Sequence, residues 1–298
     1  MDYKSLKCFC DLAQSLNFRE SSARLNMSQP ALSVRIQRLE DELGFLLFHR
    51  SATGVSLTKE GDLFLPQAMR SQVQMEHLVE EASQIRRGNV GRLRIAYTPL
   101  SFFTRVPELI QKFSSSNPDV EIVLEERLSE DIEEALSLDY IDAGFLHGPL
   151  TTDELSFYEL QSDEFLAAIP QSNPLAQLDV IPFKKLSEEN LILVSETTGP
   201  YLFQEIIATC HHHKFTPKIR QQVATSIGVL GLVAAGYGIG FVISSLQDYT
   251  FPGLQFRPLK NGFAPLTTGL AIRDAEDNPI IQNLIQFASR EFQLQGDL

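Results

Sequence analysis

The sequence has few of the residues and motifs on which catalysis or covalent cross-linking depends. It has no tryptophan and three cysteines, Cys8, Cys10 and Cys210. An odd number of cysteines in a chain without a secretion signal argues against a disulfide framework. We interpret Cys210 as a packing residue of a helix and leave a redox role for it open. The motifs G-x-S-x-G, P-loop, H-E-x-x-H and C-x-x-C are absent, so we expect neither an enzyme nor a bound metal or cofactor.

Long apolar runs are also absent. The longest weakly polar stretch, residues 229–243, is too short for one membrane-spanning helix and is interrupted by four glycines. The first ten residues carry Asp2, Lys4 and Lys7 and lack the apolar core of a signal peptide. We therefore expect a cytoplasmic protein that does not contact a membrane.

Net positive charge is missing from both halves of the chain, but the acidic excess is uneven. The net charge is −13; residues 1–90 hold 11 Lys+Arg against 11 Asp+Glu, whereas residues 91–298 hold 14 against 27. DNA binding needs a local positive potential rather than a basic chain. The neutral N-terminal part therefore permits DNA binding, and the acidic remainder would repel phosphates.

Three helices are predicted in the first 45 residues. Apolar residues at helical spacing predict helices over residues 3–16 and 18–25, and a third helix from an N-cap at Ser28 to a C-cap at Gly44. One face of the third helix is an apolar stripe, and the opposite face is mostly polar. The stripe consists of Leu32, Ile36, Leu39 and Leu43. A short helix, a tight turn and a second helix with one polar face are typical of a helix-turn-helix.

A hairpin and a long helix are predicted next. Residues 46–48 and 55–57 are predicted strands, joined by a turn over residues 51–54. A helix capped by Thr58 is predicted to reach Arg87, with apolar residues at coiled-coil spacing. The positions at that spacing are Phe64, Ala68, Ser71, Met75, Leu78, Ala82 and Ile85. The alternatives are a seam between two chains and packing on the helix's own domain; we favour the seam, because a helix of about 30 residues outruns the small domain before it.

From residue 91 the pattern changes to alternating strands and helices. Strands are predicted over residues 93–97, 120–124, 141–146, 164–169, 191–194, 239–243 and 270–272, and helices over 102–116, 129–137, 201–211, 226–235 and 279–292. This order predicts two α/β lobes with mostly parallel sheets covered by helices. The glycines between residues 236 and 240 look like a dinucleotide loop, but they end a helix and enter a strand, the reverse of the required order. We interpret Gly236 as a helix C-cap, and the consecutive histidines at 211–213 as too divergent to share a metal.

Several segments resemble LysR-type transcriptional regulators. FRESSARLNMSQPALSVRIQRLE (residues 18–40) resembles the helix-turn-helix of that family, and ELGFLLFHR (42–50) and LTKEG (57–61) are similar to its next two signatures. IDAGF (141–145) and GLVAAGYGIGFV (231–242) resemble motifs of its effector domain. The resemblance implies a winged helix-turn-helix over residues 1–58, a dimerising linker helix over 59–89, and a two-lobed effector domain similar to periplasmic binding proteins over 90–298. Lobe I is expected at about 90–160 and 266–298, and lobe II at about 161–265.

The resemblance also implies a function. It implies a homodimer that assembles into a homotetramer on double-stranded promoter DNA, with DNA binding or bending modulated by a small-molecule effector between the lobes. A contact with RNA polymerase is left open. The alternatives are a stand-alone small-molecule binding protein, which would leave residues 18–58 without a purpose, and an α/β enzyme.

The predicted DNA contacts gather at the start and on the outer face of the third helix. Gln29 can pair with an adenine edge, Ser33 can donate to a base or a phosphate, and arginines suit phosphates. The predicted set is Ser28, Gln29, Pro30, Ser33, Val34, Arg35, Gln37, Arg38 and Arg50. Val34 stands where the family often has a basic or polar residue, and residues 51–57 lack the arginines common in the family's wing. We therefore expect weaker and less salt-sensitive DNA binding by each subunit.

The predicted effector contacts follow from the same resemblance. The set is Thr98, Leu100, Ser101, Ser129, His147, Thr197, Thr198 and Tyr201. Loops at the carboxyl ends of strands are the expected ligand positions in open α/β sheets, and hydroxyls beside a helix N-terminus suit a carboxylate. His147 lies near a position where relatives that bind dicarboxylates can have an arginine, so a permanent positive charge is not expected there. The alternative role of each hydroxyl is helix or turn capping.

Overall fold

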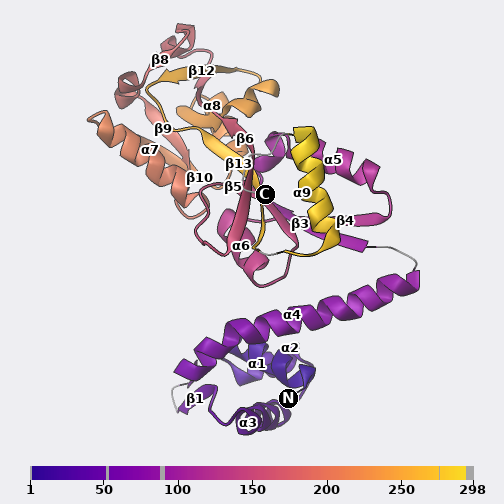
Figure 1. Ribbon diagram of the computed structural model, residues 1–298. Helices are drawn as coiled ribbons and strands as arrows, with labels where there is room; N and C mark the ends of the chain where they lie inside the picture. The colour runs from indigo at the N-terminus through magenta and orange to yellow at the C-terminus, as the bar shows by residue number, and fades with distance from the viewer. Residues whose placement is uncertain (1, 52–53, 88–90, 275, 293–298) are drawn as a thin grey trace. The chain divides into compact units, whose positions relative to one another are not determined.

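The computed structural model describes residues 2–51, 54–87, 91–274 and 276–292. The chain divides into two compact units, residues 1–91 with 138–140, and residues 92–137 with 141–298. The first unit has one hydrophobic core, and the second has two. Figure 1 shows the helices and strands of both units.

The first unit contains four helices and a two-stranded hairpin among its described residues. In chain order they are α1 (Tyr3–Ser15), α2 (Phe18–Arg24), α3 (Gln29–Leu43), β1 (Phe48–Ser51), β2 (Gly54–Leu57) and α4 (Lys59–Arg87). The predicted caps of α3 are confirmed: the Ser28 hydroxyl accepts a hydrogen bond from the Ala31 amide, and Gly44 ends the helix at φ +78°. The left-handed conformation of Gly44 costs little because glycine has no Cβ.

The predicted first strand of the hairpin, residues 46–48, is wrong. Strand β1 begins at Phe48, and the backbone at its start is held by a side chain. The buried carboxylate of Glu40 accepts hydrogen bonds from the Leu47 amide at 2.8 Å and the Phe48 amide at 3.1 Å. A backbone that donates to α3 in this way cannot donate there to a partner strand.

The apolar stripe of α3 lies in the core of the first unit. Leu32, Ile36 and Leu39 are at most 1% exposed and pack with α1, whose Phe9 is fully buried. The Phe9 ring also contacts Phe48 of the hairpin, with 5.6 Å between ring centroids. The stripe thus fixes which face of α3 points away from the core.

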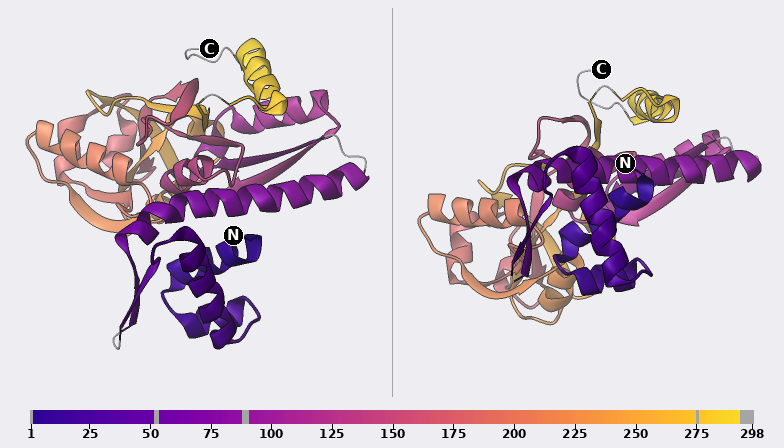
Figure 2. Two further views of the ribbon diagram at one scale, coloured as in Figure 1. Left: turned by 60° about the horizontal axis from the view of Figure 1, so that its bottom comes forward. Right: turned by 90° about the horizontal axis from the view of Figure 1, so that it is seen from below.

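Helix α4 packs on its own unit at its start and extends past it (Figure 2). Phe64 and Ala68 belong to the core of the first unit, so the prediction of a seam between chains is wrong for these two positions. Further along, Met75 is 42% exposed and Leu78 is 60% exposed. The side chains of Ala82 and Ile85 lie outside the described part of the chain.

The second unit contains two sheets, each covered by helices. The five-stranded sheet has the order β4-β3-β5-β13-β6 and the six-stranded sheet the order β10-β9-β11-β7-β12-β8. The first comprises β3 (Gly91–Tyr97), β4 (Val120–Glu126), β5 (Ala143–His147), β6 (Leu155–Asp163) and β13 (Leu266–Arg273), with helices α5 (Val106–Ser116), α6 (Ser129–Ser137) and α9 (Pro279–Phe292). The second comprises β7 (Phe165–Pro170), β8 (Ile181–Pro182), β9 (Asn190–Val194), β10 (Lys218–Val223), β11 (Ile239–Ile243) and β12 (Leu254–Lys260), with helices α7 (Pro200–His212) and α8 (Ser226–Ala234).

The chain passes between the two sheets twice, from β6 to β7 and from β12 to β13. The prediction of mostly parallel sheets is only partly right, because both sheets are mixed. Strand β13 runs antiparallel to both β5 and β6, and β7 runs antiparallel to both β11 and β12. Parallel pairs are found between β3 and β5, between β9 and its neighbours β10 and β11, and between β12 and β8.

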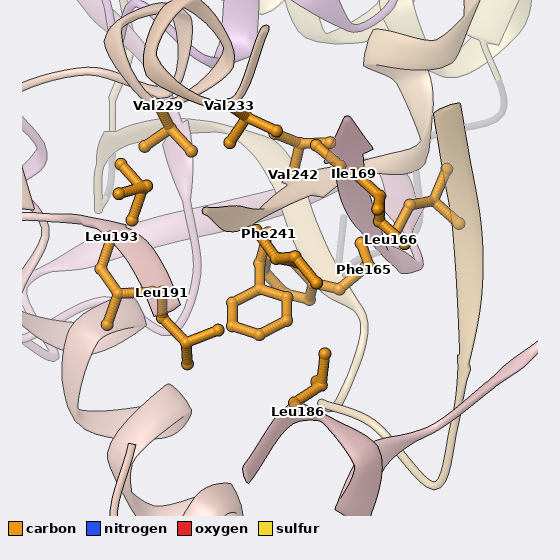
Figure 3. Packing of buried hydrophobic residues seen from close by; sticks show 14 of the residues in the cluster. Phe165, Leu166, Ile169, Leu186, Leu191, Leu193, Val229, Val233, Phe241 and Val242 are labelled. Carbon is orange, nitrogen blue, oxygen red and sulfur yellow. The ribbon is translucent and has the colours of Figure 1, made fainter. Parts of the chain in front are cut away.

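The six-stranded sheet has an almost entirely apolar centre (Figure 3). Val229 and Val233 of α8 pack over one face, and Leu186 lies against Phe241 from the other side. Helix α8 ends as expected, since Gly236 takes φ +80° just after it, so the glycine-rich segment is a helix end and not a dinucleotide loop.

Candidate functional site

A cavity of about 310 Å³ lies between the two sheets of the second unit. It is lined by residues that follow β3, β5, β9 and β10, together with the first turns of α6, α7 and α8. Loops at the carboxyl ends of strands therefore meet the positive ends of three helices at one place.

Seven of the eight predicted effector contacts line this cavity. They are Thr98, Leu100, Ser129, His147, Thr197, Thr198 and Tyr201. Ser101 is fully buried and is not part of the wall; its hydroxyl donates to the carbonyl oxygen of Thr98 at 2.8 Å. Ser101 therefore holds the loop that carries Thr98.

His147 is held between two threonine hydroxyls. Its Nε2 lies 3.3 Å from the hydroxyl oxygen of Thr98, and its Nδ1 lies 3.0 Å from that of Thr268. Burial lowers the pKa of His147 to about 4, against the opposing effect of the Asp163 carboxylate. The imidazole is therefore neutral at pH 7 and adds no charge to the cavity.

Several wall residues were not predicted. Glu133 is buried, and its carboxylate accepts hydrogen bonds from the Thr151 amide at 2.8 Å and hydroxyl at 2.6 Å. Thr225 caps α8 by accepting from the Gly228 amide at 3.1 Å. The position of Thr225 directly before an apolar helix is an N-cap signal that can be read from the sequence. The pairing of Glu133 with Thr151 joins a helix to a distant loop, and no local sequence pattern predicts it.

The predicted DNA contacts differ in how exposed their side chains are. Gln29, Gln37 and Arg38 are exposed, and Val34 is 49% exposed. Ser28 and Pro30 are exposed at the start of α3, and Ser33 is half-buried. The outer face of α3 therefore carries more amide and apolar side chains than charged ones.

Two of the three predicted arginines, Arg35 and Arg50, have partners among the described residues. A guanidinium nitrogen of Arg35 lies 3.2 Å from a carboxylate oxygen of Asp2. Arg50 donates to the Ser33 hydroxyl at 2.8 Å, lies 3.6 Å from a Glu40 oxygen, and sits 5.0 Å from the centre of the Phe18 ring. Arg50 thus ties β1 to α2 and α3.

Known families match both units. The description "Bacterial regulatory helix-turn-helix protein, lysR family" matches residues 3–62, and "LysR substrate binding domain" matches residues 86–293. The chain belongs to the LysR family. It is a DNA-binding transcriptional regulator with an effector-binding domain.

Relatives of this LysR-type regulator span its whole length. The transcriptional regulator AlsR of Bacillus subtilis is 31% identical over 289 residues, covering 97% of this chain and 96% of AlsR. XapR of Escherichia coli is 30% identical over 261 residues, covering 87% of this chain and 88% of XapR. The homologues named here are regulators rather than enzymes.

Solved structures agree on the fold. Full-length CbnR, a LysR family regulator, superposes with a TM-score of 0.72 at 23% identity, covering 98% of this chain and 99% of CbnR. The BenM effector binding domain, solved with its effector benzoate, superposes with a TM-score of 0.62 at 25% identity, covering 68% of this chain and 93% of that domain.

In the parts of the chain that the structure describes, no helix is both long and apolar enough to cross a membrane. Within the same residues, no three His, Cys, Asp or Glu side chains are grouped so that they could hold a metal ion.

Proposed function

We propose that the effector of this LysR-type regulator is a small carboxylate with an apolar body. The observation that carries the proposal is a mostly apolar cavity at which three helices begin and which no lysine or arginine of the described residues lines. Helix N-termini carry partial positive charge and unpaired amides, which favour an anion. Helix α7 begins at Pro200 without a side-chain hydrogen bond from its N-cap residue, Gly199, so its first amides are available to a ligand.

The wall's own carboxylates indicate where the anion lies. Glu130 and Glu133 are in the first turns of α6, and like charges repel at that end of the cavity. The proposed carboxylate therefore binds towards α7 and Thr98, and its apolar body contacts Leu100, Phe103 and Ile227. The likeness to a BenM domain solved with benzoate supports this class of ligand.

A thermal-shift series tests this proposal. Small aliphatic and aromatic acids, including benzoate, are compared with their amides on the full chain. A ligand at 100 times its Kd stabilises the folded state by about 2.7 kcal/mol, which is readily measured. Stabilisation by the amides and by none of the acids would rule out a carboxylate.

For DNA, we propose that α3 is the reading helix of a winged domain spanning residues 1–58. The supporting observation is that Leu32, Ile36 and Leu39 are buried while the opposite face of α3 is exposed. The proposed contacts are Ser28, Gln29, Pro30, Ser33, Val34, Arg35, Gln37, Arg38 and Arg50. Arg35 and Arg50 would contact DNA while they also interact with the carboxylates of Asp2 and Glu40.

Gel-shift titration on the DNA upstream of the protein's own gene tests the reading helix. Gln29→Ala removes a side chain that can pair with adenine, so affinity should fall by roughly tenfold or more. Gln111→Ala, an exposed glutamine of α5 in the second unit, is the matched control. Equal affinity of both variants would show that Gln29 does not read DNA, and no binding by the wild type would favour a stand-alone binding protein.

We propose further that residues 59–89 pair two chains and that dimers assemble into a homotetramer. The effector domain, residues 90–298, has lobe I at about 90–160 and 266–298 and lobe II at about 161–265, and these lobes would couple it to the assembly. An effector that binds one arrangement of the lobes more tightly shifts the population towards that arrangement. The spacing of the DNA-binding domains then changes with the arrangement of the lobes.

A further inference from the structure

Thr268 forms a hydrogen bond with His147, which lines the effector cavity. Thr268 is on β13 and pairs directly with His147 on β5 in the antiparallel register. It is 1% exposed, and within the described residues its hydroxyl has one hydrogen-bond partner, Nδ1 of His147. A buried hydroxyl that only accepted a bond would leave its own hydrogen without an acceptor, which is costly. The Thr268 hydroxyl therefore donates to Nδ1.

The tautomer of His147 in turn determines whether the Thr98 hydroxyl accepts or donates a hydrogen bond at Nε2. A neutral imidazole carries one proton, so when Nδ1 accepts, Nε2 bears the hydrogen and donates. Its acceptor is the Thr98 hydroxyl oxygen at 3.3 Å. The same oxygen also accepts from the Ser101 amide at 3.3 Å. With two hydrogen bonds accepted, the remaining hydrogen of Thr98 is free to point into the cavity that Thr98 lines.

We propose that His147 is a positioning residue, locked by Thr268 in the Nε2–H tautomer, which presents the Thr98 hydroxyl to the effector as a hydrogen-bond donor. The cavity then selects an effector with an acceptor atom, such as a carboxylate oxygen, at that point. The inference rests on the proposed function for the ligand class, but the tautomer is a property of the chain without ligand.

The Nδ1–H tautomer of His147 would give the cavity different hydrogen-bonding groups. If Nδ1 carried the proton, Nε2 would accept the Thr98 hydrogen, and the Thr98 oxygen would offer the effector no donor. The Thr268 hydroxyl would then lack an acceptor in a buried strand. The chain would thus prefer an amide or hydroxyl donor to an acid at this point.

The tautomer can be read directly from the full chain labelled with ¹⁵N-histidine. Correlation spectra of ring nitrogens with ring hydrogens distinguish the Nε2–H form, the Nδ1–H form and the imidazolium. The chain has six histidines, so His147→Gln identifies the signal by its loss. The expected result at pH 7 is the neutral Nε2–H form. An Nδ1–H or doubly protonated His147 overturns the proposal.

Thr268→Val tests the lock, because valine has nearly the same shape and no hydroxyl. Nδ1 then has no partner in either tautomer, so the preference for the Nε2–H form should weaken, and benzoate affinity should fall by up to about fivefold, the usual worth of one hydrogen bond. Thr267→Val, the neighbouring position on the alternate face of β13, is the matched control and should change neither. An unchanged His147 signal in Thr268→Val overturns the role of Thr268. If benzoate and other acids fail to bind the wild type, the proposed function fails, while the wild-type spectrum still decides the tautomer.

Discussion

His147, a single partly buried imidazole, makes the stability of the effector domain depend on pH. Its pKa is about 4 in the folded chain, against about 6.5 for an exposed histidine. The unfolded chain therefore takes up a proton first as pH falls, so stability is complete above about pH 6.5 and decreases towards pH 4. At pH 5 the loss should be about 2 kcal/mol.

Denaturant titrations of wild type and His147→Gln at pH 7 and pH 5 measure this effect. Other groups titrate equally in both proteins, so their contribution cancels in the difference. The free energy of unfolding of the wild type should fall further than that of His147→Gln. A difference between the proteins that is the same at both pH values would contradict the depressed pKa of His147.

At the scale of elements, Glu40 joins α3 to the hairpin. Its buried carboxylate accepts two backbone hydrogen bonds from residues 47 and 48, and Arg50 lies 3.6 Å away. Glu40→Ala leaves these amides without an acceptor and should destabilise the first unit by about 2 kcal/mol. Asp41→Ala, an exposed carboxylate on the next residue, should change stability by less than about 0.5 kcal/mol. Thermal unfolding followed by circular dichroism compares them; equal midpoints would mean that Glu40 does not hold β1.

The exposed part of α4 carries the proposed pairing of chains. Leu78 is 60% exposed, and one helical turn before it Met75 is 42% exposed. Leu78→Asp puts a charge into the proposed apolar seam and should shift the sedimentation pattern to smaller species, because a buried charge without a partner is costly. Val180→Asp puts the same charge at an exposed apolar position of the second unit, away from α4, and should leave the assembly intact. Unchanged sedimentation of Leu78→Asp would move the interface elsewhere.

The sequence predicts elements whose ends are set by neighbouring residues. It fails where residues far apart in the chain determine the structure. The start and end of α3 follow from Ser28 and Gly44, which act within one turn of the helix. Strands β6, β8, β10 and β12 were not predicted, and β10 is mostly exposed and polar, so only its neighbour β9 makes it a strand. The site shows the same division: the positions of Thr98 and His147 at the carboxyl ends of strands were predictable, whereas the bond from Thr268 to His147 joins residues 121 positions apart.

At the scale of the whole molecule, charge distribution determines how DNA binding responds to salt. The net charge is −13, Arg35 and Arg50 are paired with Asp2 and Glu40, and the stretch 51–57 has no cation. Each phosphate neutralised contributes about −0.9 to the slope of log K against log salt concentration. A dimer with about two phosphate contacts per subunit should therefore have a slope near −4, well short of strongly salt-dependent repressors.

Adding one cation to α3 tests the same argument from the other direction. Val34 is 49% exposed on the face proposed to meet DNA, so Val34→Arg should steepen the slope by about 0.9 per subunit. Val180 is 47% exposed in the second unit, and Val180→Arg adds the same charge away from the proposed DNA contact. Fluorescence anisotropy on one operator over a range of salt concentrations compares the three proteins. If both variants steepened the slope equally, net charge rather than α3 would govern binding; a wild-type slope near −10 would mean that cations outside α3 and the hairpin carry the contact with DNA.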